Sequence, residues 1–159
     1  MDSNNFTTTF LVKQSPAEVF NSINNVRGWW SEEIEGGTNQ LNDEFTYRYE
    51  DVHSCKMKLI EVVPFKKVVW LVLDNYFSFT SDKSEWIGNK IIFEITAKGD
   101  KTHIRFTQEG LVPEYECFDV CEKAWTDYLQ NSLKNLIISG KGAPNPKEGK
   151  LTHELETNN

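Results

Sequence analysis

The 159-residue sequence has little that would direct it to nucleic acid or to a membrane. Its net charge of −7, with no basic stripe, argues against binding to phosphate backbones or anionic lipids, which need Lys and Arg gathered on one face. No segment approaches the roughly 20 apolar residues of a membrane-spanning helix. The polar N-terminus also lacks the basic and apolar regions of a secretory signal, so we expect a cytoplasmic protein.

Cysteine is scarce, and its three positions form no disulfide framework. Cys55, Cys117 and Cys121 are odd in number and irregularly spaced. Cys117 and Cys121 would share one face of a helix, but a zinc site needs further ligands, and no His or Cys lies near them in the sequence. We therefore expect small buried thiols in a reduced protein, with no metal and no cofactor.

Catalytic motifs are missing as well. The three histidines are isolated, and no Ser/His/Asp or Cys/His arrangement can be argued from their positions. No glycine-rich phosphate loop is present. Acidic residues between Glu109 and Glu116 fit a solvated turn before a helix, which the helix dipole favours. The sequence thus predicts no catalytic residue.

Aromatic residues are what the chain has in quantity, at 13% of its length. In one domain this means a bulky interior, an aromatic-lined pocket, or both. The length predicts a single domain, which we place at residues 1–142. The remainder, 143–159, is polar and broken by proline, and we expect it to be a disordered tail.

The first third of the chain predicts a strand followed by two short helical elements. Residues 6–12 alternate in the manner of a strand. A capping box with Ser15 and Glu18 starts a helix that runs to about Ile23. Residues 24–37 carry a tryptophan doublet, Trp29–Trp30, on a second short helix or turn, with one indole expected inside and the other exposed.

The rest of the chain predicts further strands and then a long helix. Alternating runs indicate strands at 44–50, 54–63 and 67–73 and a hairpin at 89–109, while 74–86 is interpreted as a loop whose aromatics could form a lid. From residue 117, apolar positions recur every three or four residues, and Gly140 is a suitable stop. These elements predict an antiparallel sheet with the last helix as its one large cover.

Several stretches in this order resemble the START-like (SRPBCC) superfamily. More narrowly, they resemble the family related to the activator of heat-shock protein 90 ATPase. The stretches are Phe10–Phe20, Gly28–Trp30, Leu59–Trp70, Thr102–Gly110 and Lys123–Leu133. Two features depart from the pattern: Ala124 stands where glycine is common, and the loop 74–86 aligns with nothing.

The resemblance implies an α+β helix-grip fold. A curved antiparallel sheet of about six strands would wrap around the long C-terminal helix, with two short helices after the first strand. It also implies an apolar cavity between sheet and helix, and no catalytic set shared across the family. The residues expected to line this cavity, unless they are simply packed core, are Trp30, Tyr47, Tyr49, Trp70, Phe77, Phe93, Phe106, Trp125 and Leu129.

Three functions remain open from the sequence. The first is a protein that binds a hydrophobic or aromatic small molecule in the cavity, with no nucleic acid or membrane as partner. The second is a cyclase- or hydrolase-type enzyme that uses the same cavity. The third is a co-chaperone-like interaction domain, with a protein partner or a homodimer. Fold alone does not choose among them.

Overall fold

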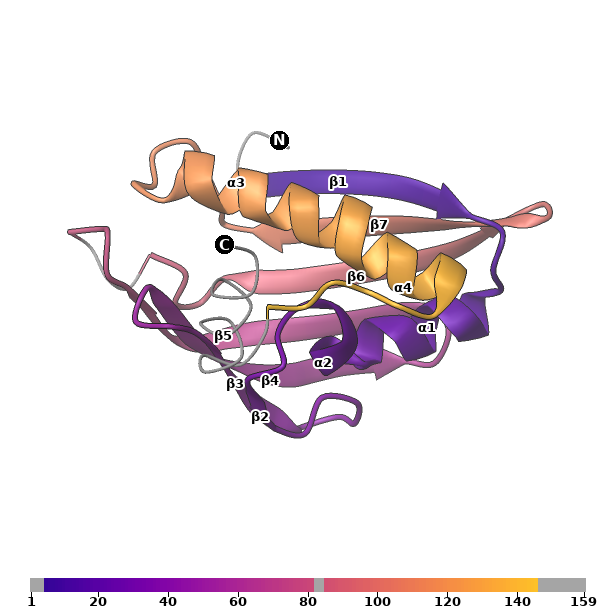
Figure 1. Cartoon of the computed structure of the whole chain (residues 1–159), viewed down its shortest axis with the longest axis horizontal. Coiled ribbons are helices and arrows are strands. Elements are labelled where there is room, and N and C mark those ends of the chain that lie inside the picture. Colours follow the sequence, from indigo (N-terminus) through magenta and orange to yellow (C-terminus); the bar gives the residue numbers. More distant parts are fainter. Residues whose placement is uncertain (1–4, 82–84, 146–159) are drawn as a thin grey trace, which may run out of the picture.

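A computed structural model describes residues 5–81 and 85–145 of the chain (Figure 1). It contains a seven-stranded sheet in which every neighbouring pair is antiparallel, in the order β1-β7-β6-β5-β4-β3-β2. The strands are β1 (Asn5–Val12), β2 (Ile34–Gly36), β3 (Glu44–Tyr49), β4 (His53–Val63), β5 (Lys67–Phe77), β6 (Lys90–Lys98) and β7 (Lys101–Glu109). The register shifts twice between β4 and β5, and bulges of this kind increase the local twist of a sheet.

Helices cover one face of this sheet. Two short helices, α1 (Pro16–Asn24) and α2 (Val26–Trp29), follow β1. Near the C-terminus, α3 (Phe118–Asp127), η2 (Tyr128–Leu133) and α4 (Lys134–Ser139) join without a break. We call this run the C-terminal helix; it crosses the sheet diagonally, and α1 lies beside α4 while α2 lies beside η2 (Figure 1). The α+β helix-grip fold expected from the sequence is therefore confirmed.

Local sequence signals account for the boundaries of these helices. Ser15 and Glu18 form the predicted capping box at the start of α1. Gly140 follows the C-terminal helix with φ +83°, a left-handed conformation that suits glycine. Within the helix, η2 has the wider π-helical turn, which no pattern in the sequence predicted and which in proteins often marks a functional site.

Two strands differ from the sequence prediction. β2 is a seventh strand, and its three residues are too few to show an alternating pattern. β5 continues through Phe77, so the first part of the predicted loop at 74–86 is strand. The sequence did not predict this extension because the polar residues Asp74 and Asn75 interrupt the apolar pattern of the strand.

Residues 143–145, which we call the C-terminal strap, are hydrogen-bonded to the domain, whereas the sequence predicts that the tail begins at residue 143. The backbone N–H of Asn145 donates to Trp30 O at 3.0 Å, and its carbonyl accepts from Glu32 N at 2.8 Å. The Ala143 N–H donates to Ser132 Oγ at 2.8 Å. The domain therefore includes residues 143–145. The rest of the predicted tail, 146–159, lies outside the described residues.

Across the described part of the chain, the helices are too short or too polar to cross a lipid bilayer.

Candidate functional site: an aromatic cavity beside the C-terminal helix

The interface between the C-terminal helix and the centre of the sheet is fully packed. The ring centroid of Trp125 lies 4.6 Å from that of Phe106 on β7. The Trp125 Nε1–H donates to Gln108 Oε1 at 2.7 Å, and both side chains are buried. Leu129 and Leu133 follow on the same face and are also buried. This density of contact is that of a protein core.

Four of the residues expected to line a cavity belong to this packed core instead. They are Trp70, Phe93, Phe106 and Leu129, all with no exposed surface. The Trp70 ring meets Phe93 edge-on with centroids 5.0 Å apart, and Phe93 meets Phe106 in the same way at 5.3 Å. Strand and helix periodicity places a side chain on the inner face but does not reveal whether the space opposite is filled.

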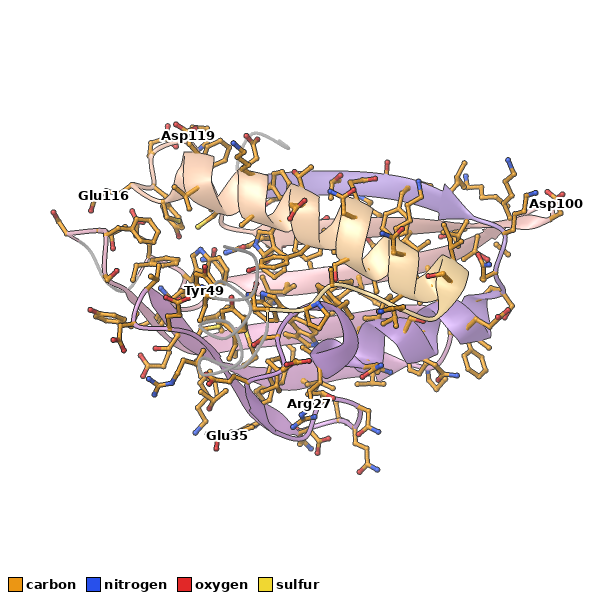
Figure 2. All side chains as sticks on the ribbon, in the orientation of Figure 1. Arg27, Glu35, Tyr49, Asp100, Glu116 and Asp119 are labelled. Carbon is orange, nitrogen blue, oxygen red and sulfur yellow. The ribbon has the colours of Figure 1, made fainter. Side chains whose placement is uncertain are left out.

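A cavity of about 130 Å³ remains on the other side of Trp125, beside the first turns of α3. Figure 2 shows Tyr49, Glu116 and Asp119 toward the same end of the molecule, with Asp100 of the β6–β7 turn at the opposite end. We call this space the aromatic cavity. Its walls are Trp30, Tyr47, Tyr49, Val52, His53, Phe77, Phe79, Trp86, Val120, Cys121, Ala124, Trp125 and Tyr128.

The tryptophan doublet contributes to the cavity wall, and the burial of its two indoles differs from the sequence prediction. Trp29 and Trp30 are both buried, so the expectation that one of them is exposed was wrong. Trp30 is stacked on Tyr47, with centroids 4.0 Å apart and planes 13° apart, and its centroid is 5.1 Å from that of Trp125. The second of these indoles is buried because the C-terminal helix packs against α2.

A cluster of three polar side chains stands at the edge of the cavity. The hydroxyl oxygens of Tyr47 and Tyr128 are 3.3 Å apart. Asn145 Nδ2 donates to both, at 3.1 Å to Tyr47 and 2.7 Å to Tyr128. The strap, β3 and the π-helical turn thus meet at this cluster. Burial, and then the neighbouring Tyr128, raise the pKa of Tyr47 well above its ordinary value, so its hydroxyl is neutral.

His53 is a titratable residue in the cavity wall. Its Nε2 lies 2.9 Å from Asn75 Oδ1, and its ring is stacked on Phe77 with centroids 4.3 Å apart. Burial lowers the pKa of His53 to about 4, against the smaller raising effect of the Asn75 hydrogen bond. The ring is neutral at pH 7. With Nε2–H donating to Asn75, Nδ1 retains a lone pair.

The part of the cavity wall that the structure describes carries no formal charge. None of the described residues that line it is Asp, Glu, Lys or Arg. The Cys121 thiol is also neutral, because its hydrogen bond with Cys117 and its burial raise its pKa. Burial likewise raises the pKa of Cys55. The site therefore favours uncharged molecules, since an isolated ion would lose its hydration on entry.

No group of three or more His, Cys, Asp or Glu residues in the described chain is arranged to hold a metal. All three cysteines are buried, as expected from their pattern. Cys121 lines the aromatic cavity, which its sequence position did not indicate.

The structure brings together part of the predicted set and adds residues that sequence reasoning missed. Five predicted residues line the cavity: Trp30, Tyr47, Tyr49, Phe77 and Trp125. His53 and Trp86 were missed because each stands in a polar stretch with no periodic signal. The one sequence signal for these two residues is composition. A large aromatic side chain in an otherwise polar stretch is expected to pack against another part of the protein.

A sheet that grips a long C-terminal helix, with two short helices after its first strand, defines the helix-grip class of fold. Among solved structures, the chain is similar to the Aha1 dimer from Colwellia psychrerythraea, with a TM-score of 0.71 and 22% identity over 87% of this chain and 98% of that chain. This agrees with the resemblance drawn from the sequence. No family model and no curated protein matches the chain by sequence.

Two more distant solved structures share the fold. A protein from Mesorhizobium loti has a TM-score of 0.68 and 11% identity, over 87% of this chain and 99% of that one. CalU16 from Micromonospora echinospora has a TM-score of 0.60 and 12% identity, over 85% and 76% of the two chains. At these identities the likeness is one of fold.

Proposed function

We propose that the protein binds a small apolar or aromatic molecule in the aromatic cavity. One observation carries the proposal: a space walled mostly by rings, with no charged side chain among its described lining residues, remains beside Trp125, while the adjoining interface is fully packed. Ligand sites are concave and mostly apolar, with a few placed polar groups, and here the polar groups are the Tyr47–Tyr128–Asn145 cluster and His53.

The size of the cavity limits the ligand. Its volume of about 130 Å³ is below the roughly 300 Å³ at which pockets for drug-sized molecules begin. It is close to the ~150 Å³ of an engineered apolar cavity that takes up benzene. The ligand that fits is therefore about the size of a single ring, unless the rim residues Phe79 and Val120, both exposed, move outward.

Titration with toluene tests the proposal directly. We expect saturable binding by calorimetry and an upward shift of the melting temperature, because a ligand that binds only the folded state stabilises it. Ala124→Leu, which adds three carbons to the cavity wall, is expected to abolish binding. Ala97→Leu, the same change on the exposed part of β6, is the matched control and should bind as the parent does. No saturable binding by the parent protein, or equal binding by Ala124→Leu, would contradict the proposal.

A second candidate function is an enzyme that uses the same cavity, and His53 is the observation that favours it. A partly buried, neutral imidazole that is hydrogen-bonded to Asn75 beside a ligand space, with its pKa perturbed, is a feature of many reacting sites. The expected result is turnover of a bound aromatic compound that is lost in His53→Gln while toluene still binds. Turnover that survives this substitution would exclude His53 as the reacting group.

A protein partner is a third candidate. The solved structure from Colwellia psychrerythraea is described as a dimer. A homodimer of this chain would appear as twice the 18.4 kDa protomer mass in light scattering at micromolar concentration. A single species at the protomer mass would argue against it.

A further inference from the structure

We infer that the ligand of the aromatic cavity is an uncharged single-ring molecule carrying a hydroxyl group, a phenol or an aryl alcohol. The inference rests on the proposed function and adds the chemical class. Three observations carry it: the hydrogen bonds left unmade at the Tyr47–Tyr128–Asn145 cluster, the shape of the walls, and the absence of charge among the described lining residues.

The cluster has more hydrogen-bonding capacity than it uses. Each tyrosine hydroxyl has one O–H and two lone pairs, and the two N–H groups of the Asn145 amide occupy one lone pair on each. The contact between Tyr47 and Tyr128 uses one O–H and one further lone pair. Within the described chain, one O–H and one lone pair therefore remain without a partner.

The two unused positions are always on different tyrosines. If Tyr47 donates to Tyr128, then Tyr128 keeps its hydrogen and Tyr47 keeps a lone pair. If Tyr128 donates instead, the two roles are exchanged. The oxygens are 3.3 Å apart and both residues line the cavity, so the position that we propose for the ligand's hydroxyl is beside both of them.

A hydroxyl group matches this pair, whereas a carbonyl, an ether or a hydrocarbon does not. Its oxygen accepts the free O–H, and its hydrogen goes to the free lone pair. A carbonyl or ether oxygen would accept one bond and leave the lone pair unfilled, and a hydrocarbon would leave both positions unfilled. A ligand that covers these two positions without pairing them leaves a desolvated polar group unpaired, and this is what makes a site reject a ligand that lacks the matching group.

The walls favour a flat ring as the rest of the ligand. Trp30 and Tyr47 are stacked with planes 13° apart, and Trp86 and Trp125 are stacked with planes 13° apart. His53 adds a neutral ring rather than an imidazolium. A carboxylate or an ammonium on the ring would enter without a counter-charge, so ionised aromatics are expected to be excluded.

The experiment compares phenol with toluene, which has the same shape with methyl in place of hydroxyl. Calorimetry gives the ratio of the two affinities in the parent protein and in Tyr47→Phe, Tyr128→Phe and Tyr76→Phe. Tyr76 is exposed on β5, outside the cavity wall, and is the matched control. We expect the preference for phenol to fall about fivefold in Tyr47→Phe and in Tyr128→Phe, the size of one neutral hydrogen bond, and to stay unchanged in Tyr76→Phe.

Benzoate and benzylamine complete the series and are expected to bind at least tenfold more weakly than phenol. The inference is overturned if the phenol-to-toluene ratio is the same in all four proteins, or if benzoate binds as tightly as phenol. Toluene binding without a phenol preference would overturn the inference and leave the proposed function standing. Binding of neither compound would overturn both. Melting curves of each variant identify any substitution that prevents folding. Because Tyr128 is partly exposed, Tyr128→Phe is the substitution least expected to impair folding.

Discussion

The indole Nε1–H of Trp125 donates a hydrogen bond to Gln108 Oε1 at 2.7 Å in the buried layer between the C-terminal helix and β7. Gln108 in turn donates from Nε2 to Asn89 Oδ1 at 2.9 Å, and Asn89 Nδ2 donates to the Tyr115 hydroxyl at 3.2 Å. This relay fixes the position of Trp125, whose ring separates the packed core from the aromatic cavity. The helix is thus held to the sheet by a specific bond in addition to apolar burial.

Loss of this bond is expected to destabilise the fold. Gln108→Leu leaves both the Trp125 N–H and Asn89 Oδ1 without this partner, and we expect the free energy of unfolding to fall by about 2–4 kcal/mol. Trp125→Phe removes the same N–H. In urea unfolding, the double variant should be less destabilised than the sum of the two single variants by about 1 kcal/mol or more. Strict additivity would show that the bond contributes little.

Stability should depend on pH through His53. The pKa of His53 is about 4 in the folded protein, against about 6.5 in an unfolded chain. Between these values the unfolded chain binds the proton and the folded protein does not. The free energy of unfolding therefore falls as the pH drops from about 6.5 to about 4, by up to roughly 3 kcal/mol. Above this range His53 is neutral in both states, so the free energy of unfolding no longer depends on its titration.

Urea unfolding at pH 7, 5 and 4 isolates the effect of His53. His53→Gln should lose this part of the pH dependence. His103→Gln, at a partly exposed position on β7, should retain it and is the matched control. Identical pH profiles for the parent and His53→Gln would contradict the assignment.

The C-terminal strap should contribute to stability out of proportion to its length. A chain ending at Asn145 keeps the bonds to Trp30, Glu32 and Ser132, and its melting temperature should match that of the full chain within about 2 °C. A chain ending at Gly142 loses them all. We expect it to lose roughly 2–4 kcal/mol, or about 5–10 °C in melting temperature for a domain of this size. Equal melting temperatures for the two truncated chains would show that the strap is not needed.

The cysteine thiols should be unreactive in the native protein. All three are buried, and the pKa values of Cys55 and Cys121 are raised by burial and, for Cys121, first by the hydrogen bond with Cys117. Only the thiolate is nucleophilic. With a disulfide reagent at pH 8, we expect no fast-reacting thiol in the native state and three after denaturation. A thiol that reacts fast before unfolding would contradict this.

The sequence by itself determined most of the fold. The alternation in β1 and in the hairpin of β6 and β7, the capping box before α1 and the glycine after the C-terminal helix are local signals, read within a few residues of the structure they specify. It missed β2, which is too short for periodicity, and it ended β5 before Asp74 because polar residues interrupt the apolar run.

Only the tertiary structure decided which inward-facing rings are core and which line the cavity. Phe106 and Tyr47 both point inward from their strands, yet Phe106 meets Trp125 in the packed centre, while Tyr47 borders open space with Tyr128 and Asn145. A cavity forms where side chains from separate strands, loops and a helix do not fill the space between them. No single segment of the sequence therefore encodes it. His53 entered the site for the same reason, since three of the partners that enclose it, Asn75, Phe77 and Trp86, lie 22 or more residues further along the chain.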